Sequence, residues 1–263
     1  MTIAEGGFRQ PLNRVVAPLL MIGVFVGAWE IYARNSSIGD TVLPPFSRVA
    51  QAGWADRQSL VANTLPTLRE VLVGFVISVL FAFLISILLD VSPRANRAVM
   101  PLLIGSQTIP LVVLAPLFVI WFGFGFFPKI LLVTLVTFFP IVVGLIDGYA
   151  SSERDSVTLL RTMGAGTLTV FGLVRLPSAM PGFFTGLRIG ITYAVVAAIF
   201  AEYAGAVNGL GVYIQGASGS FRTDLVLAGV LVAATLTLVL YALTVLVQRL
   251  AIPWYTQSRE VSR

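Results

Sequence analysis

Residues 129–148 read KILLVTLVTFFPIVVGLIDG, a run in which the charged side chains, Lys129 and Asp147, stand only near the two ends. A helix that crosses a hydrocarbon core of about 30 Å needs about 20 mostly apolar residues. Five further stretches have the same character, namely 15–33, 70–89, 99–122, 186–206 and 224–248. We therefore predict an all-α membrane protein with about six transmembrane helices.

The composition supports this prediction and excludes several classes of site. Of the 263 residues, 57% are hydrophobic and only 11% are charged, whereas soluble domains carry about a quarter of charged residues. Cysteine and histidine are absent, which excludes disulfides, thiolate nucleophiles and the commonest metal ligands. The basic residues stand singly at the edges of apolar segments, so the net charge of +5 does not indicate nucleic-acid binding.

The basic residues also predict the orientation, because they are enriched in cytoplasmic segments. With the N-terminus inside, eleven of them fall on the cytoplasmic side: Arg9, Arg14, Arg94, Arg97, Arg154, Arg161, Arg175, Arg188, Arg249, Arg259 and Arg263. Six fall outside: Arg34, Arg48, Arg57, Arg69, Lys129 and Arg222. We expect a multi-pass protein of the bacterial inner (plasma) membrane with both termini in the cytoplasm.

Three regions follow from this topology. Residues 1–69 form an anchor helix and an external segment, in which a stiff Leu43-Pro44-Pro45-Phe46-Ser47 stretch precedes an amphipathic helix. Residues 70–250 form the core transmembrane domain, and residues 251–263 form a cytoplasmic tail. Within the core, Gly182, Gly186 and Gly190 predict close helix packing, because small residues let helix backbones approach.

The cytoplasmic segment 149–185 has the most informative pattern. We expect a helix, a break at Gly164, a second helical stretch and a stop at Pro177. A short amphipathic helix at this face suits docking into a groove on another protein. It equally suits an interfacial helix that lies on lipid headgroups.

A resemblance separates these alternatives. Gly164, nine further residues and then Val174-Arg175-Leu176-Pro177 resemble the second half of E-A-A-x3-G-x9-I-x-L-P, the signature of binding-protein-dependent permeases of ABC importers. The first half differs, since Thr158-Leu159-Leu160 stand where the family has Glu-Ala-Ala. The resemblance implies that this segment couples to an ATPase through Thr158, Leu159, Leu160, Met163, Gly164, Ala165, Val174, Leu176 and Pro177.

Other blocks are similar to the nitrate, sulfonate and taurine branch of these permeases, which includes permeases for thiamine-pyrimidine precursors. They are 115–125 (APLFVIWFGFG), Ala201-Glu202-Tyr203, Asn208-Gly209-Leu210-Gly211 and Pro253-Trp254. The resemblance implies the type I ABC importer permease fold and a homodimer with the pathway at the subunit interface. It also implies ATP-binding-cassette ATPase subunits beneath and an extracytoplasmic solute-binding protein.

A permease of this kind has no nucleotide site of its own. A P-loop needs a Gly-Lys-Ser/Thr sequence, and the only lysine, Lys129, lies between Pro128 and Ile130. We therefore expect no enzyme activity and no cofactor in this chain, with ATP and Mg²⁺ bound by the partner ATPase.

Six residues are candidates for the translocation path. Pro110 and Pro116 interrupt the hydrogen-bond ladder of the third span, which is tolerated where a helix lines a cavity. Trp121 and Phe122 form either an aromatic belt at the interface or a lining for a flat solute. Glu202, beside Tyr203, either faces the path or pairs with Arg222.

Two rival functions remain open, an ion-coupled secondary carrier and a structural subunit of a membrane complex. Carriers place ionisable residues near the membrane midplane, and the middles of these spans are nearly free of charge. The cargo we expect is a small polar or heteroaromatic solute: a sulfonate, nitrate, taurine or a pyrimidine-type vitamin precursor. The aromatic residues of 120–127 favour the heteroaromatic class.

Overall fold

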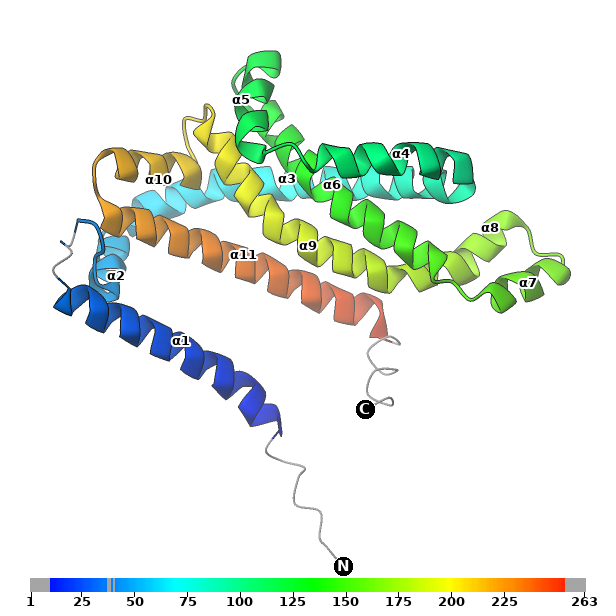
Figure 1. Cartoon of the computed structure of the whole chain (residues 1–263), viewed down its shortest axis with the longest axis horizontal. Coiled ribbons are helices and arrows are strands. Elements are labelled where there is room, and N and C mark those ends of the chain that lie inside the picture. Colours follow the sequence, from blue (N-terminus) through cyan, green and yellow to red (C-terminus); the bar gives the residue numbers. More distant parts are fainter. Residues whose placement is uncertain (1–9, 37–38, 40, 254–263) are drawn as a thin grey trace, which may run out of the picture. The chain divides into compact units, whose positions relative to one another are not determined.

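The computed structural model describes residues 10–36, 39 and 41–253, and all regular elements in this part are helices (Figure 1). They are α1 (Gln10–Asn35), α2 (Phe46–Ala55), α3 (Arg57–Val91), α4 (Pro93–Ser106), α5 (Leu111–Phe122), α6 (Phe126–Ala150), α7 (Arg154–Thr162), α8 (Thr167–Val170), the π-helical turn η1 (Phe171–Arg175), α9 (Leu176–Tyr203), α10 (Leu210–Gly219) and α11 (Thr223–Ala251). The chain divides into two compact units, residues 1–59 with 214–230 and residues 60–213 with 231–263.

In the smaller unit, a carboxylate fixes the corner between α1 and α2. Glu30 on α1 accepts hydrogen bonds from the backbone N–H and the hydroxyl of Ser47, at 3.0 and 2.8 Å, and from Arg34 at 2.6 Å. The Trp29 ring meets Phe46 edge to face, with 5.6 Å between centroids. The amphipathic helix predicted after the proline pair is confirmed as α2, which begins directly after Pro45.

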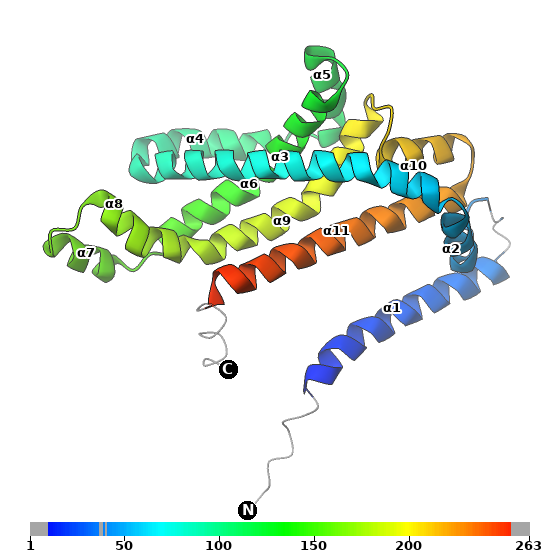
Figure 2. The same cartoon turned by 180° about the vertical axis from the view of Figure 1, so that it is seen from behind.

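The larger unit is built around α3, α6 and α9, and Figure 2 shows α3 along its length. A Cβ atom built on Gly182 of α9 would overlap the Gly144 carbonyl oxygen of α6, and one on Gly148 would lie 2.5 Å from the Ala179 Cα. Because only glycine permits such an approach, the predicted close packing at Gly182 and Gly186 is confirmed. The buried core of this unit includes Leu89, Ile141, Val142, Leu145, Phe183 and Phe184.

Five helices in the described part are long and apolar enough to cross a membrane: α1, α3, α6, the continuous helix 167–203 and α11. The third span predicted over 99–122, in which prolines were expected to interrupt the hydrogen-bond ladder, is divided into two helices. α4 and α5 meet at 98° across residues 107–110, and the pair counts as a sixth span only if taken together (Figure 1). Pro110 begins α5; it lacks an N–H and disfavours a helical conformation for Ile109, so one helix cannot run through.

Candidate functional site

A cavity of about 820 Å³ lies against the α4–α5 break, α6 and α9, and we call it the α4–α5 groove. Its walls are mostly apolar, with aromatic faces from Phe139, Tyr193 and Phe200. The polar side chains that line it are Ser106, Gln107, Thr108, Asp147, Thr185 and Tyr193. Asp147 carries the only charge among the lining residues, so the groove offers an apolar, aromatic surface with a few hydrogen-bonding groups.

The α4–α5 break adds backbone groups to this groove. The N–H groups of Ile109, Leu111 and Val112 have no backbone partner within the described part of the chain. Irregular backbone at membrane depth is stable only when it is buried in protein or lines a water-filled cavity. The break therefore belongs on a path or a protein interface, and not against lipid.

The predicted path residues fall into four places. Pro110 lines the groove, and Pro116 lies exposed in the middle of α5. Trp121 and Phe122 end α5, where they are 62% and 48% exposed and contact Phe118 and each other. Glu202 and Tyr203 end α9 outside the groove lining. A role of these residues in transport stays a prediction.

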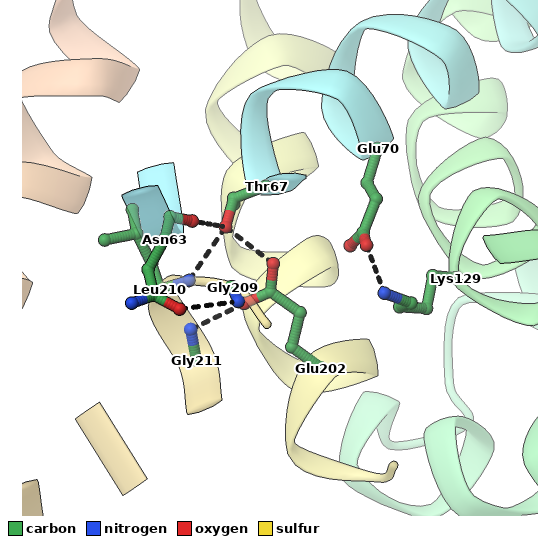
Figure 3. Close-up of polar contacts among 8 residues, drawn as sticks. All are labelled: Asn63, Thr67, Glu70, Lys129, Glu202, Gly209, Leu210 and Gly211. Carbon is green, nitrogen blue, oxygen red and sulfur yellow. Dashed lines mark hydrogen bonds and ion pairs between the residues drawn. The ribbon is translucent and has the colours of Figure 1, made fainter. Parts of the chain in front are cut away.

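Glu202 is the centre of a buried polar network (Figure 3). Its Oε1 accepts from the Thr67 hydroxyl at 2.6 Å, and its Oε2 accepts from the Gly211 N–H at 2.5 Å. Thr67 in turn accepts from the Leu210 N–H at 2.9 Å. The network ties α3, the end of α9 and the start of α10 together.

This arrangement differs from the Glu202–Arg222 pair that the sequence left open. The Arg222 guanidinium binds Asp224, through Nε and Nη2 at 2.9 and 3.0 Å. Asn63 completes the network around Glu202 by accepting from the Gly209 N–H at 3.0 Å. Sequence reasoning missed Asn63 and Thr67, because nothing local links them to a carboxylate more than 130 residues away.

An ion pair between Lys129 and Glu70 lies beside the network around Glu202 (Figure 3). Lys129 Nζ on α6 donates to Glu70 Oε1 on α3, and the two side chains are 12% and 2% exposed. The other oxygen of Glu70, Oε2, is buried and has no hydrogen-bond partner in the described part of the chain. The sequence placed both residues near span ends but gave no signal that they pair.

The segment predicted to couple to an ATPase begins with α7. Gly164, at φ +83°, ends the turn after this helix, and the Ala165 N–H bonds back to the Leu160 carbonyl at 2.9 Å. Glycine adopts this left-handed conformation without the steric cost of a side chain. Three apolar side chains of the turn are largely exposed, Leu159 at 61%, Met163 at 74% and Leu168 at 87%.

The expected helix stop at Pro177 is wrong. α8, η1 and α9 form one continuous helix over 167–203, so only residues 151–166 lie between the long helices. In η1 the Leu176 N–H bonds to the Phe171 carbonyl, five residues back. This wide turn shifts the hydrogen-bond register just before Pro177. Pro177 then lies in the first turn of α9, where its missing N–H is tolerated.

The part of the predicted coupling segment that precedes α9 is fixed to α3. Arg175 Nη1 donates to both carboxylate oxygens of Asp90, at 2.7 and 2.6 Å. The Tyr149 hydroxyl lies 3.3 Å from the Ser86 hydroxyl, and its ring packs on Phe171 with 5.5 Å between centroids. Polar and aromatic contacts therefore join η1 and the end of α6 to α3.

Comparison with known proteins decides the family. The sequence pattern of the family described as "Binding-protein-dependent transport system inner membrane component" matches residues 74–257. The chain belongs to this family of ABC importer permeases. The matched residues include the α4–α5 groove, the predicted coupling segment 149–185 and Glu202, whereas Asn63, Thr67 and Glu70 lie just before them.

Relatives of the permease carry different names for their cargo. It is 35% identical over 243 residues to the formylaminopyrimidine transport permease protein ThiX of Halalkalibacterium halodurans, covering 92% of this chain and 96% of that protein. It is 30% identical over 257 residues to the taurine transport system permease protein TauC of Escherichia coli, covering 94% and 93%. Both are named as transport permease proteins, which agrees with the prediction of a transport subunit.

A solved structure confirms the predicted fold. The permease superposes with a TM-score of 0.62 on a chain of a crystal structure described as an amino acid ABC transporter with histidines. The match covers 76% of the permease and 97% of that chain at 16% identity, so it establishes the fold alone. The permease is thus a multi-pass, all-α membrane protein of the ABC importer type.

Proposed function

We propose that the permease carries a small, flat heteroaromatic solute of the pyrimidine type into the cell. An extracytoplasmic binding protein delivers the solute, and a separate ATP-binding-cassette ATPase, which binds ATP and Mg²⁺, drives transport. The observation that carries the cargo class is the lining of the α4–α5 groove, which has three aromatic side chains, one acidic side chain and no basic one.

The lining favours this cargo over a sulfonate or nitrate. A strongly hydrated anion loses its water on entering an apolar groove and needs a cation in return, and the only lining charge, Asp147, repels it. A heteroaromatic ring loses less hydration and gains from stacking on Phe139, Phe200 or Tyr193. The relative named for formylaminopyrimidine supports the same class, and the one named for taurine supports the alternative.

The coupling to the ATPase rests on the turn after α7. Leu159, Met163 and Leu168 expose apolar surface at a helix end, where docking into a groove of a partner removes that surface from water. Gly164 makes the tight turn that brings α7 back toward α8 (Figure 1). When ATP closes the ATPase pair, the turn moves with it, and Asp90–Arg175 transmits the motion to α3.

The remaining parts of the proposal follow from orientation and symmetry. Residues 149–185 and both termini lie in the cytoplasm of a bacterial cell, as the distribution of basic residues predicts. A second copy of the chain closes the open α4–α5 groove into a path at the interface of a homodimer. Lipid surrounds the remaining faces, where many large apolar side chains are exposed.

The test is ATPase stimulation in proteoliposomes that contain the permease, its ATPase and the cognate binding protein. Binding protein loaded with formylaminopyrimidine should raise the ATPase rate several-fold and deliver the labelled solute. The same binding protein exposed to taurine should do neither. Stimulation by taurine alone would contradict the cargo class. Stimulation by neither solute would contradict the proposed transport of either one.

A further inference from the structure

Two buried carboxyl groups, one from α3 and one from α9, lie in contact with each other. Glu70 and Glu202 are each only 1% exposed. Figure 3 shows the two carboxyl groups between Thr67 on one side and Lys129 on the other, and they lie in hydrogen-bond contact. Such a contact needs a hydrogen atom, and the neighbouring groups show whether one is supplied.

Three of the four carboxyl oxygens have a donor. Glu70 Oε1 accepts from Lys129. Glu202 Oε1 accepts from the Thr67 hydroxyl at 2.6 Å, and Oε2 accepts from the Gly211 N–H at 2.5 Å. The fourth oxygen, Glu70 Oε2, is buried and has no donor in the part of the chain that the structure describes, and it is this oxygen that lies against Glu202.

Two ionised carboxylates cannot supply the missing hydrogen. Each would have acceptors only, and two like charges in contact in a buried place repel each other. If one carboxyl group is protonated, its O–H donates to the other, and a hydrogen bond from a carboxyl to a carboxylate is short and strong. One proton thus removes the repulsion and also gives Glu70 Oε2 the partner that nearly every buried polar atom has.

The nearby cations do not take the place of this proton. Lys129 on α6 donates to the other oxygen of Glu70. Arg69, next to Glu70 on α3, lines a cavity of about 780 Å³ together with Lys129. Both cations offset negative charge, so the net charge of the cluster does not decide the protonation. A cation at a distance still places no hydrogen between the oxygens of Glu70 and Glu202.

The other neighbouring elements add no further charge. Tyr203 follows Glu202 on α9 and interacts with it electrostatically. Residues 204–219, which lead into α10, contain Tyr213 and no charged side chain, and α5 contains no charged side chain either. The protonation of the pair therefore depends on the two carboxyl groups, the two cations and the tyrosines.

We propose that Glu70 and Glu202 hold one proton between them, and that this carboxyl–carboxylate hydrogen bond joins the end of α9 to α3. The inference does not depend on the cargo of the permease. When the pair loses its proton to the solvent, two negative charges face each other in a buried place. The contact between α3 and the end of α9 is then weakened, so the packing of this corner is sensitive to alkaline pH.

The sign of the pH effect follows from the number of bound protons. In the unfolded chain both glutamates are ionised at neutral pH, whereas the folded pair keeps one proton. Because the folded state binds more protons, stability falls as the pH rises and the pair loses its proton. Glu70→Gln puts an amide N–H in place of the shared proton, so it should keep the hydrogen bond and remove this pH dependence.

The first test is infrared spectroscopy of the purified complex of permease and ATPase at neutral pH. A protonated carboxyl group has its own C=O band, which shifts in heavy water. The difference spectra of wild type against Glu70→Gln and against Glu202→Gln should each show one such band, because either change leaves one carboxylate bonded to an amide. Glu153→Gln is the matched control, since it removes an exposed carboxylate and should show no such band.

Each other result of the infrared test overturns the proposal. If the band is absent from both difference spectra, both carboxyl groups are ionised. If it is present in only one, that residue holds the proton alone and the proton is not shared.

The second test is the melting temperature of the permease in the same complex as a function of pH. Wild type and Glu153→Gln should lose several degrees between neutral and alkaline pH, and Glu70→Gln should lose less than half as much. Equal losses in wild type and Glu70→Gln overturn the proposal. If Glu70→Gln does not fold, Glu202→Gln takes its place, with the amide donor on the opposite side.

If neither variant folds, wild type alone decides. Its protonated-carboxyl band should disappear over the pH range in which its melting temperature falls. A wild-type protein whose melting temperature falls without loss of such a band, or that has no such band at neutral pH, overturns the proposal.

Discussion

Thr67 donates its hydroxyl hydrogen to Glu202 Oε1 at 2.6 Å, although 135 positions separate the two residues. The same hydroxyl accepts from the Leu210 N–H, and Glu202 Oε2 accepts from the Gly211 N–H. Both side chains are buried, so each of these groups depends on the others for its hydrogen bonds. The pair therefore fixes how the end of α9 packs on α3.

Glu202→Gln should be tolerated and Glu202→Lys should not. A glutamine can turn its amide nitrogen to the Thr67 oxygen while that hydroxyl donates to the Asn63 carbonyl, which lies 3.2 Å away. A lysine has no acceptor for the Gly211 N–H and leaves a buried site without its carboxylate, at a cost of about 3–5 kcal/mol. Membrane abundance and melting temperature check this, and full uptake by Glu202→Lys would show that the network is dispensable.

Gly211→Ala should destabilise the permease by about 1–3 kcal/mol, because a Cβ there would lie 2.6 Å from the Ile199 carbonyl and 2.9 Å from Glu202 Oε2. Gly216→Ala on the same helix is the matched control, since no atom of the described part of the chain lies within 4 Å of its Cβ position. The melting temperature of the first variant should fall by several degrees, and that of the second should not. Equal melting temperatures would argue against the packing around Glu202.

Arg175→Ala should reduce the transport driven by the ATPase more than it reduces stability. The Asp90–Arg175 pair is partly exposed, so its loss should cost no more than about 1 kcal/mol. Exchanging the charges, with Asp90→Arg and Arg175→Asp together, should restore part of the uptake that each single change removes. If the double variant is no better than the singles, the pair does not act as a unit.

The sequence predicted those features that depend on local pattern. The apolar runs predicted the positions of the membrane helices. Pro44 and Pro45 predicted the start of α2, and the glycine spacing around Gly182 predicted the close packing against α6. The block Asn208-Gly209-Leu210-Gly211 was recognised as a family feature. Its physical reason became visible only in the structure, where Cβ atoms at Gly209 and Gly211 would meet the Glu202 carboxylate.

The features that the sequence did not predict have three physical causes. Three prolines in 99–122 signalled a weakened helix, but the angle of 98° depends on how α4 and α5 pack. Pro177 resembled a stop because a proline breaks a regular helix, and the π-helical turn before it removes that conflict. Two ion pairs join residues that lie far apart in the sequence, Glu70–Lys129 over 59 positions and Asp90–Arg175 over 85. A single sequence contains no pattern that predicts such pairs.

The orientation can be tested with single cysteines, because the permease has no native cysteine. We expect that a membrane-impermeant maleimide labels Ser220→Cys in sealed cells and leaves Ser156→Cys unlabelled. Permeabilising the cells should expose Ser156→Cys and serves as the control for reactivity. The reverse pattern in sealed cells would overturn the assignment of residues 149–185 to the cytoplasm.

The central claim is that the turn after α7 couples the permease to an ATPase, and Gly164→Asp tests it most directly. No described residue lies within 4 Å of a Cβ at Gly164, so the change adds charge and backbone strain without disturbing the membrane helices. The measurement is ATPase stoichiometry and binding-protein-dependent uptake of the purified complex. We predict normal membrane abundance, with uptake lost and the ATPase either dissociated or no longer stimulated by the binding protein. A Gly164→Asp permease that keeps a stoichiometric ATPase and transports at the wild-type rate would contradict the account.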